Sequence, residues 1–384
     1  MSSNEQPAVI PKKTATRNGK NRSYTMIVGA DGSVNIPTFD AVQVSTMTII
    51  AHTNLIVNTD KFFKFMPYTD WTMVRKKRGR KRKIQPDDPN KDIPAGSIIS
   101  LTKKRCVRGV VLKPKKKKSK TFFRHSVSVV MILEGGKMLN VKVSRNGKLQ
   151  MTGAKTLDHA VDFMKHMYDL MIQSEAWTGE TLFTYKTDND DVGDEPEDEV
   201  AAECSEPMDL VETETPLERA VNAGLCVVFR CVMRNIDFGV GFRVRRDLLD
   251  KFINLHTDFR SIFEASVGTS VNVKLEVANR SDPQLVRLRI TGQGECIDDH
   301  IAYEDFFKTL SAKDQRDERR KQSYHTFLVF ASGSVIMSSA GGDMPLVFYK
   351  FVKMLVENRK FIEEGDDSKI IESKWLEDDA VIEV

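Results

Sequence analysis

Cysteine, histidine and tryptophan are scarce in this chain, whose 384 residues include five Cys, seven His and three Trp. The odd number of scattered Cys predicts no disulfide framework, and no CxxC or HExxH motif offers the ligand spacing of a structural zinc site. No run approaches the roughly 20 consecutive apolar residues of a membrane span. The polar N-terminus (Met1 to Tyr24) lacks the apolar core of a signal peptide. These absences predict a soluble, intracellular protein with reduced thiols.

The small net charge of +4 hides two opposite surpluses. Residues 75–120 hold 19 Lys or Arg against three Asp, whereas residues 187–214 hold 13 Asp or Glu and no Lys or Arg. Neither segment has enough apolar residues to build a core. The sequence therefore predicts a nearly neutral folded body that carries one basic insert and one acidic linker.

Hydrophobic patterns predict antiparallel strands and amphipathic helices on both sides of the acidic linker. Strands are expected at 44–51, 110–112, 126–133, 138–143, 148–152, 225–233, 271–277, 285–290, 326–330 and 335–338. Helices are expected to start at the capping residues Asp60, Thr156, Asp247 and Asp343. The segments 271–277 and 285–290 are expected to pair as a hairpin. Strands followed by helices in this order predict the α+β class.

The two halves repeat one another at a nearly constant offset. Asn146-Gly147 and Ser332-Gly333 are 186 residues apart, as are Met151-Thr152 and Met337-Ser338, while the caps Asp60 and Asp247 are 187 apart. This predicts a duplicated domain with helices on one face of a curved sheet and a ligand or solvent on the other. The alternative is two unrelated α+β domains whose turn motifs coincide.

The stretch from Asn146 to Lys155 (NGKLQMTGAK) resembles the end of a repeat in the TATA-box-binding protein family, as does Thr326 to Ala340 (TFLVFASGSVIMSSA). The divergent members of this family in large DNA viruses are the most similar. The resemblance implies a duplicated saddle with helices on its convex face. The expected parts are a disordered tail (1–40), a first repeat (41–175) with the basic insert 75–120, an acidic linker (186–215), a second repeat (216–362) with an insert at 292–323, and an acidic tail (363–384).

The resemblance also implies that the concave sheet binds the minor groove of duplex DNA, prefers A·T pairs and uses apolar wedges. Phe330 matches a wedging Phe, and Leu328 a groove-facing apolar position. The remaining DNA-binding candidates are polar or basic: Thr48, Lys148, Thr152, Lys155, Asn235 and Ser338. The basic tract is expected to contact phosphates: Arg75, Lys76, Lys77, Arg78, Arg80, Lys81, Arg82 and Lys83.

Several positions depart from the family pattern. Ser144 stands where the first repeat should carry its wedging Phe, and Ser334 and Gly341 replace two basic residues. Plainer interpretations remain open for the candidates as well. Phe330 and Leu328 could be core residues and Asn235 a turn residue, and the basic tract could be a nuclear-import signal or a solubilising loop.

The resemblance implies a transcription initiation factor with double-stranded DNA as its partner. A TFIIB-like factor and an RNA polymerase are further expected partners, and the chain is expected to be a monomer with an internal pseudo-dimer. The nucleus or a viral replication factory is the expected location, with packaging in a virion as a further option. No catalytic constellation, metal site or cofactor motif is found in the sequence. The alternative function is a module for protein interaction or virion nucleic-acid packaging that has lost DNA reading.

Overall fold

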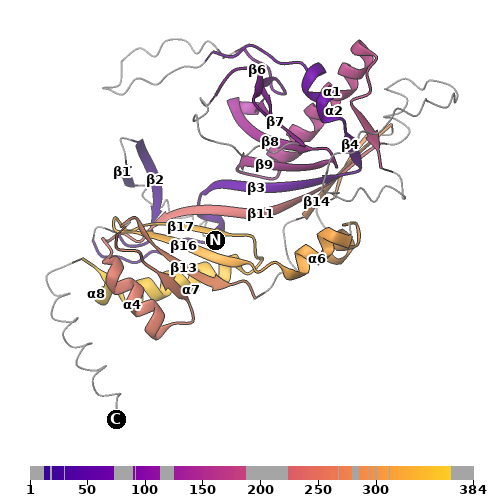
Figure 1. Ribbon diagram of the computed structural model, residues 1–384. Helices are drawn as coiled ribbons and strands as arrows, with labels where there is room; N and C mark the ends of the chain where they lie inside the picture. Colours follow the sequence, from indigo (N-terminus) through magenta and orange to yellow (C-terminus); the bar gives the residue numbers. More distant parts are fainter. Residues whose placement is uncertain are drawn as a thin grey trace, which may run out of the picture. The chain divides into compact units, whose positions relative to one another are not determined.

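The computed structural model describes residues 13–17, 20–29, 31–72, 90, 92–112, 125–186, 224–266, 268–278, 285–292, 294–298, 301–310 and 312–364 (Figure 1). The chain divides into two compact units. Unit 1 comprises Met1–Thr46, Met233–Pro283 and Lys321–Val384, and unit 2 comprises Met47–Val232 and Gln284–Arg320. The basic tract at 75–83 and the acidic segment at 187–214 lie outside the described residues.

Unit 2 is an antiparallel sheet with helices against one face (Figure 1). Its strands follow the spatial order β3 (Val44–Thr53), β9 (Lys148–Ala154), β8 (Lys137–Ser144), β7 (Ser126–Leu133), β5 (Ile98–Lys103) and β6 (Cys106–Gly109). The helices are α1 (Thr59–Phe65) and α2 (Asp158–Thr178). Along β9, Leu149 and Met151 are buried whereas Gln150 and Thr152 are exposed, as expected for a sheet covered on one face.

Unit 1 has a sheet of the same kind. Its strands follow the order β11 (Leu225–Gly239), which belongs to this unit from Met233 onward, β17 (Ser334–Ser339), β16 (Tyr324–Phe330), β13 (Ser270–Glu276) and β12 (Arg260–Ile262). The helices α4 (Arg246–His256), α7 (Met344–Glu357) and α8 (Arg359–Ile362) cover one face. The apolar core lies between them, and Phe327 of β16 stacks on Phe351 of α7 with ring centroids 3.8 Å apart.

The two units share one topology. In each of these two series, the strand that is earliest in the chain lies next to the latest one, and the others follow in reverse order: β3-β9-β8-β7-β5 in unit 2 and β11-β17-β16-β13-β12 in unit 1. A short helix follows the first strand and a long helix follows the last one in both. These observations establish an α+β protein with a mostly antiparallel sheet.

Matching contacts extend the likeness to single residues. Thr53 N–H donates to the carbonyl of Gly147 at 3.2 Å, and Val240 N–H donates to that of Gly333 at 2.9 Å. Each donor pair is separated by 187 residues and each acceptor pair by 186, the offsets found in the sequence. A second pair of contacts obeys the same offsets: Val57 to Arg145 at 2.8 Å, and Val244 to Ala331 at 3.0 Å.

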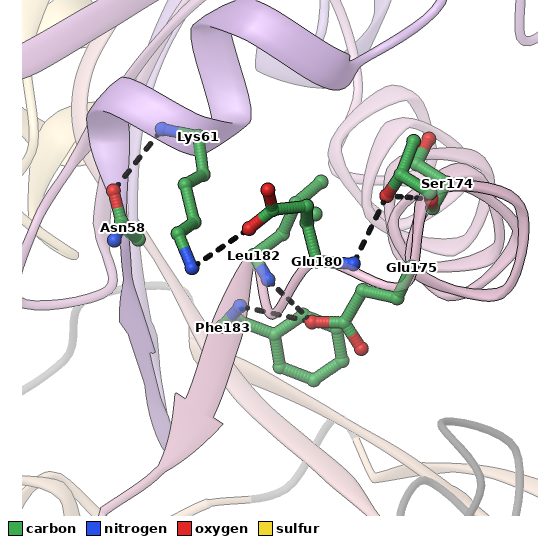
Figure 2. Close-up of polar contacts among 8 residues, drawn as sticks. Asn58, Lys61, Ser174, Glu175, Glu180, Leu182 and Phe183 are labelled. Atoms are coloured by element: carbon green, nitrogen blue, oxygen red, sulfur yellow. Dashed lines mark hydrogen bonds and ion pairs between the residues drawn. The ribbon is translucent and has the colours of Figure 1, made fainter.

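A buried carboxylate fixes the chain where α2 ends (Figure 2). Gly179 terminates the helix in the left-handed conformation, with φ of 68°. Glu175, only 1% exposed, then accepts the backbone N–H groups of Leu182 at 2.6 Å and Phe183 at 3.1 Å. This contact directs the chain into β10 (Phe183–Tyr185). β10 pairs with β4 (Leu55–Val57), the strand that directly precedes α1.

Most predicted elements are present, but three of the four predicted helix caps were wrong, and only Asp343 occupies the N-cap position of its helix. Asn58, not Asp60, caps α1 by accepting the Lys61 N–H at 3.1 Å. Neither the predicted cap Thr156 nor the residue at the start of α2, Leu157, makes a side-chain capping bond. Asp247 lies in the first turn of α4, and Asp343 precedes α7 without a side-chain capping bond to that helix. Within the segment 75–120, predicted as a basic insert with one strand at 110–112, the structure has two strands of the sheet, the largely buried β5 (Ile98–Lys103) and β6 (Cys106–Gly109).

The predicted hairpin between 271–277 and 285–290 is also wrong. β13 pairs with β12 and β16, whereas β14 (Leu285–Thr291) pairs with β11 and with β15 (Gly294–Asp298). Alternating apolar residues mark both segments as strands but do not specify their partners. β14 belongs to unit 2, together with α5 (Tyr303–Lys308) and α6 (Ala312–Arg320).

The N-terminal segment that the composition predicted as a tail contains ordered structure. β1 (Lys13–Arg17) and β2 (Lys20–Met26) pair with one another, and β2 also pairs with β11. The 3-10 helix η1 (Phe39–Ala41) follows. Ile27, Val28 and Phe39 are buried in the core of unit 1. The short apolar run at 26–28 indicates this buried segment, but the polar average composition of the N-terminal region concealed it.

Candidate nucleic-acid interface

The candidate interface consists of the sheet face that points away from α1 and α2 in unit 2 and the face that points away from α4, α7 and α8 in unit 1, which we call the open faces. On the open face of unit 2, Thr48 of β3 pairs with Thr152 of β9, which pairs with Asn140 of β8. Thr152 and Asn140 are exposed and Thr48 is half-buried. The Thr152 hydroxyl donates to the Asn140 carbonyl at 3.2 Å. Three short polar side chains therefore form one row across the sheet.

Unit 1 has the equivalent row. Asn235 of β11 pairs with Ser338 of β17, which pairs with Thr326 of β16. All three are half-buried. Thr48 and Asn235 are 187 residues apart, and Asn140 and Thr326 are 186 apart, as are Thr152 and Ser338. The register thus places the predicted residues Thr48, Thr152, Asn235 and Ser338 at equivalent positions of two equivalent faces.

The predicted apolar residues lie on the open face of unit 1. Leu328 and Phe330 follow Thr326 at intervals of two along β16, so all three side chains share this face, while Phe327 and Val329 are buried beneath it. Leu328 and Phe330 are half-buried. Ser144 of β8 is 186 residues before Phe330 and follows Asn140 at the same interval of four, so the two units differ at this position.

The two predicted lysines of unit 2 lie at opposite ends of β9. Lys155 is exposed just beyond the C-terminal end of the strand. The pKa of Lys137 is lowered, mainly by burial of Lys137 itself and secondly by the positive charge of Lys155. Lys148 begins the strand opposite His52 and forms an ion pair with Asp314 of α6 at 3.2 Å. Lys148 is therefore already bound to a carboxylate instead of being an isolated cation.

Sequence reasoning missed several open-face residues. Asn140 and Thr326 complete the polar rows, Lys142 and Gln150 continue the face of unit 2, and Asn272 pairs with Leu328. The 186-residue offset could have identified Asn140 and Thr326. The carboxamide oxygens of Asn235 and Asn272 are shielded from solvent and accept no hydrogen bond from the described residues. Such an unsatisfied group is costly unless a ligand or water supplies a donor.

Charge is not uniform on these faces. Asp237 lies on the open face of unit 1 opposite Ile336, and Lys274 lies opposite Thr326. Lys142 adds a cation to the open face of unit 2, whereas the charge of Lys148 is balanced by Asp314. A carboxylate would repel the phosphates of nucleic acid, so Asp237 is a departure from a surface built only for DNA.

A buried Ser–His–Asp group lies elsewhere in unit 1. His325 Nδ1 is 2.7 Å from Ser339 Oγ, and its Nε2 is 3.0 Å from Asp343 Oδ1. Burial lowers the pKa of His325, although Asp343 opposes this shift. Ser339 is 3% exposed and its hydroxyl accepts the Gly341 N–H, so the group joins β16 and β17 to the start of α7. It offers no accessible nucleophile.

Within the described residues, no group of three or more His, Cys, Asp or Glu side chains could hold a metal ion. In the same residues, no helix is long and apolar enough to cross a membrane.

Comparisons with known proteins were made on sequence and on structure. No protein-family model and no curated protein matches the sequence. Among solved structures, the chain is similar to Methanococcus jannaschii TBP, with 8% sequence identity and a TM-score of 0.35. That likeness covers 82% of this chain and 98% of the archaeal chain. A TM-score of this size supports no argument about function, which therefore depends on the residues described above.

Proposed function

We propose that this chain binds duplex DNA in the minor groove through the open faces of its two sheets and acts as a TATA-box-binding-protein-like transcription initiation factor. The observation that carries the proposal is the pair of equivalent polar rows, Thr48–Thr152–Asn140 and Asn235–Ser338–Thr326. Small hydroxyl and amide side chains suit the acceptor-lined edges of A·T pairs, which carry no guanine amino group. The repeat-end motifs that resemble the TATA-box-binding protein family support the same interpretation.

Three further features fit this proposal. Leu328 and Phe330 supply apolar area beside the polar row of unit 1, which is what wedging between base steps requires. Asn235 and Asn272 lie on the open face of unit 1, and their carboxamide N–H groups are of the type that can donate to the acceptor-lined edges of A·T pairs. The duplication offers two similar faces to the two similar strands of a duplex. The same proposal includes a saddle arrangement of the faces and the recruitment of a TFIIB-like factor and RNA polymerase. It also includes a location in the nucleus or in a viral replication factory.

The test is equilibrium binding of the whole chain to A·T-rich and G·C-rich duplexes of equal length at a fixed salt concentration. We expect tighter binding to the A·T-rich duplex. Phe330→Ala should weaken that binding by about 1–3 kcal/mol, because the variant loses the apolar contact with the bases. Leu346→Ala is the control, since Leu346 is an apolar residue of α7 that is 71% exposed. Equal affinity for both duplexes, with no effect of Phe330→Ala, would exclude minor-groove reading.

A second candidate function is a protein-interaction or nucleic-acid packaging module that has lost sequence reading. Ser144 at the position equivalent to Phe330, and Asp237 on the open face of unit 1, favour it. This function predicts no duplex binding at low salt, together with stable co-purification with a polymerase or TFIIB-like partner.

A further inference from the structure

The connection between two strands of unit 1 is much longer than its counterpart. In unit 2, β7 and β8 are joined by the short helix η2 (Glu134–Gly136) alone. In unit 1, the equivalent strands β13 and β16 end at Glu276 and begin at Tyr324. The inserted part 284–320 leaves unit 1 and belongs to unit 2, where β14 pairs with β11 from Leu225 to Arg230.

A small apolar core anchors the insertion in unit 2. Val228, Leu285, Phe306 and Leu310 are each at most 8% exposed and form one cluster. The Phe306 ring of α5 also meets the imidazole of His52 edge-on, with centroids 5.4 Å apart. Burial of these apolar side chains holds α5 against the sheet.

Helix α6 is attached by its acidic side. Asp314 forms an ion pair with Lys148 at 3.2 Å, and Glu318 forms one with Arg230 at 2.5 Å. Lys148 begins β9 directly after the turn that follows Ser144. The helix therefore lies at the end of the open face of unit 2 where Ser144 replaces an aromatic residue. At the equivalent end of its own sheet, unit 1 has Phe330.

The outer side of α6 is basic. Lys313, Arg316 and Arg320 are exposed and follow one another at intervals of three and four, which places them on one stripe of the helix. Asp317 is the single acidic residue on this stripe. The three cations extend over about 10 Å of helix axis, at 1.5 Å per residue. Asp314 and Glu318 face the sheet, so the outer side of α6 carries three cations and one carboxylate.

We propose that α6 is a second nucleic-acid contact, in which Lys313, Arg316 and Arg320 bind the phosphate backbone of a duplex lying on the open face of unit 2. This inference rests on the proposed function and adds to it a contact that carries no sequence preference. Phosphates are the favoured partner because the stripe is cationic and its helix is held by ion pairs at one end of the open face of unit 2, whereas the stripe has no aromatic residue for stacking on single-stranded bases.

The test measures duplex affinity of the whole chain over a range of salt concentrations. Arg316→Gln combined with Arg320→Gln should weaken binding about tenfold on A·T-rich and G·C-rich duplexes alike. It should also reduce the slope of log K against log salt by about 2, because two phosphate contacts are lost. Lys251→Gln combined with Lys353→Gln is the control, since these residues are exposed on the helices α4 and α7. Its slope should equal that of the wild type.

Each outcome separates this inference from the proposed function. If the wild type binds duplex and Phe330→Ala weakens it, but the α6 variant behaves like the control, the inference is overturned and the function stands. If the α6 variant instead loses affinity only for poly-L-glutamate, the stripe serves an acidic protein partner and the inference is again overturned. If the wild type binds no duplex at any salt, both are excluded. Thermal unfolding of both variants confirms that the fold is intact.

Discussion

Two glycines show how tightly the repeated turns are built. Gly147 and Gly333 have φ of 71° and 78°, in the left-handed region. A Cβ at Gly147 would lie 2.0 Å from the carbonyl oxygen of Leu55, and one at Gly333 would lie 2.0 Å from that of Phe242. Backbone atoms cannot yield as a flexible side chain can. Both turns therefore require glycine for conformation and for space.

Replacing either glycine should be severely destabilising. We expect Gly147→Ala and Gly333→Ala each to lower the free energy of unfolding by at least about 3 kcal/mol, because left-handed strain adds to a backbone clash. Gly135→Ala is the matched control, since Gly135 has φ of 67° with no atom within 4 Å of an added Cβ. It should cost only about 1–2 kcal/mol. Urea denaturation followed by circular dichroism measures all three, and equal losses would contradict this account.

Single residues also limited the sequence-based site prediction. The register places Thr48, Thr152, Asn235 and Ser338 at equivalent positions, and their contact with DNA stays a prediction. Asn140 and Thr326 could have been found from the offset. The ion-pair partner of Lys148 could not be predicted, because Asp314 is 166 residues away and only the packing of the insertion brings the two side chains together.

At the scale of elements, the docking of α5 against β3 depends on a neutral histidine. Burial, assisted by nearby Lys148, lowers the pKa of His52 from 6.5 to about 4. Asp314 opposes the shift, whereas Lys186 and Arg230 contribute to it. Since the folded-state pKa lies below the unfolded one, the unfolded chain binds more protons between these values. The contribution of His52 to stability is therefore complete above pH 6.5 and is lost as the pH falls toward 4.

This linkage can be measured with a variant that cannot titrate. As the pH is lowered from 7 to 4, the wild type should lose up to about 3 kcal/mol of unfolding free energy relative to His52→Gln. Urea midpoints over that range provide the measurement, and amide exchange in α5 locates the loss. The control is His125→Gln, the same substitution at an exposed histidine before β7. A difference between wild type and His52→Gln that stays constant with pH would contradict a buried neutral His52.

Elements were predictable to the extent that their periodicity was clear. The amphipathic pattern that predicted helices after Asp247 and Asp343 is confirmed by α4 and α7, each of which buries one apolar stripe, because such a helix shows this spacing in the sequence itself. Strand partners were not predictable where the chain leaves a repeat and returns. β14 was assigned to β13 on proximity in sequence, yet it pairs with β11. Long-range pairing depends on which buried faces match, and alternation alone does not encode that.

At the scale of the whole molecule, the two units share a strand order and have matching backbone contacts at offsets of 186 and 187 residues. Their open faces nevertheless differ. Unit 1 has Phe330 on its open face, whereas unit 2 has Ser144 and the docked helices α5 and α6. We therefore expect the two faces to contribute unequally to binding, with apolar contacts from unit 1 and phosphate contacts from unit 2.

The central claim is that the open faces themselves bind duplex DNA. A carboxylate placed in each polar row tests it most directly, through the double variant Thr152→Glu and Ser338→Glu. The double variant Thr181→Glu and Ser266→Glu is the control, since it adds the same charge at exposed hydroxyl residues outside both sheets. The measurement is affinity for an A·T-rich duplex at about 0.1 M salt.

The account predicts that the open-face variant loses at least about a hundredfold in affinity, because two carboxylates would face the acceptor-lined groove and adjacent phosphates. The control should lose no more than about threefold, the effect of added charge at a distance screened by salt. Equal affinity of the two double variants would contradict the claim and show that duplex DNA, if bound, is bound elsewhere.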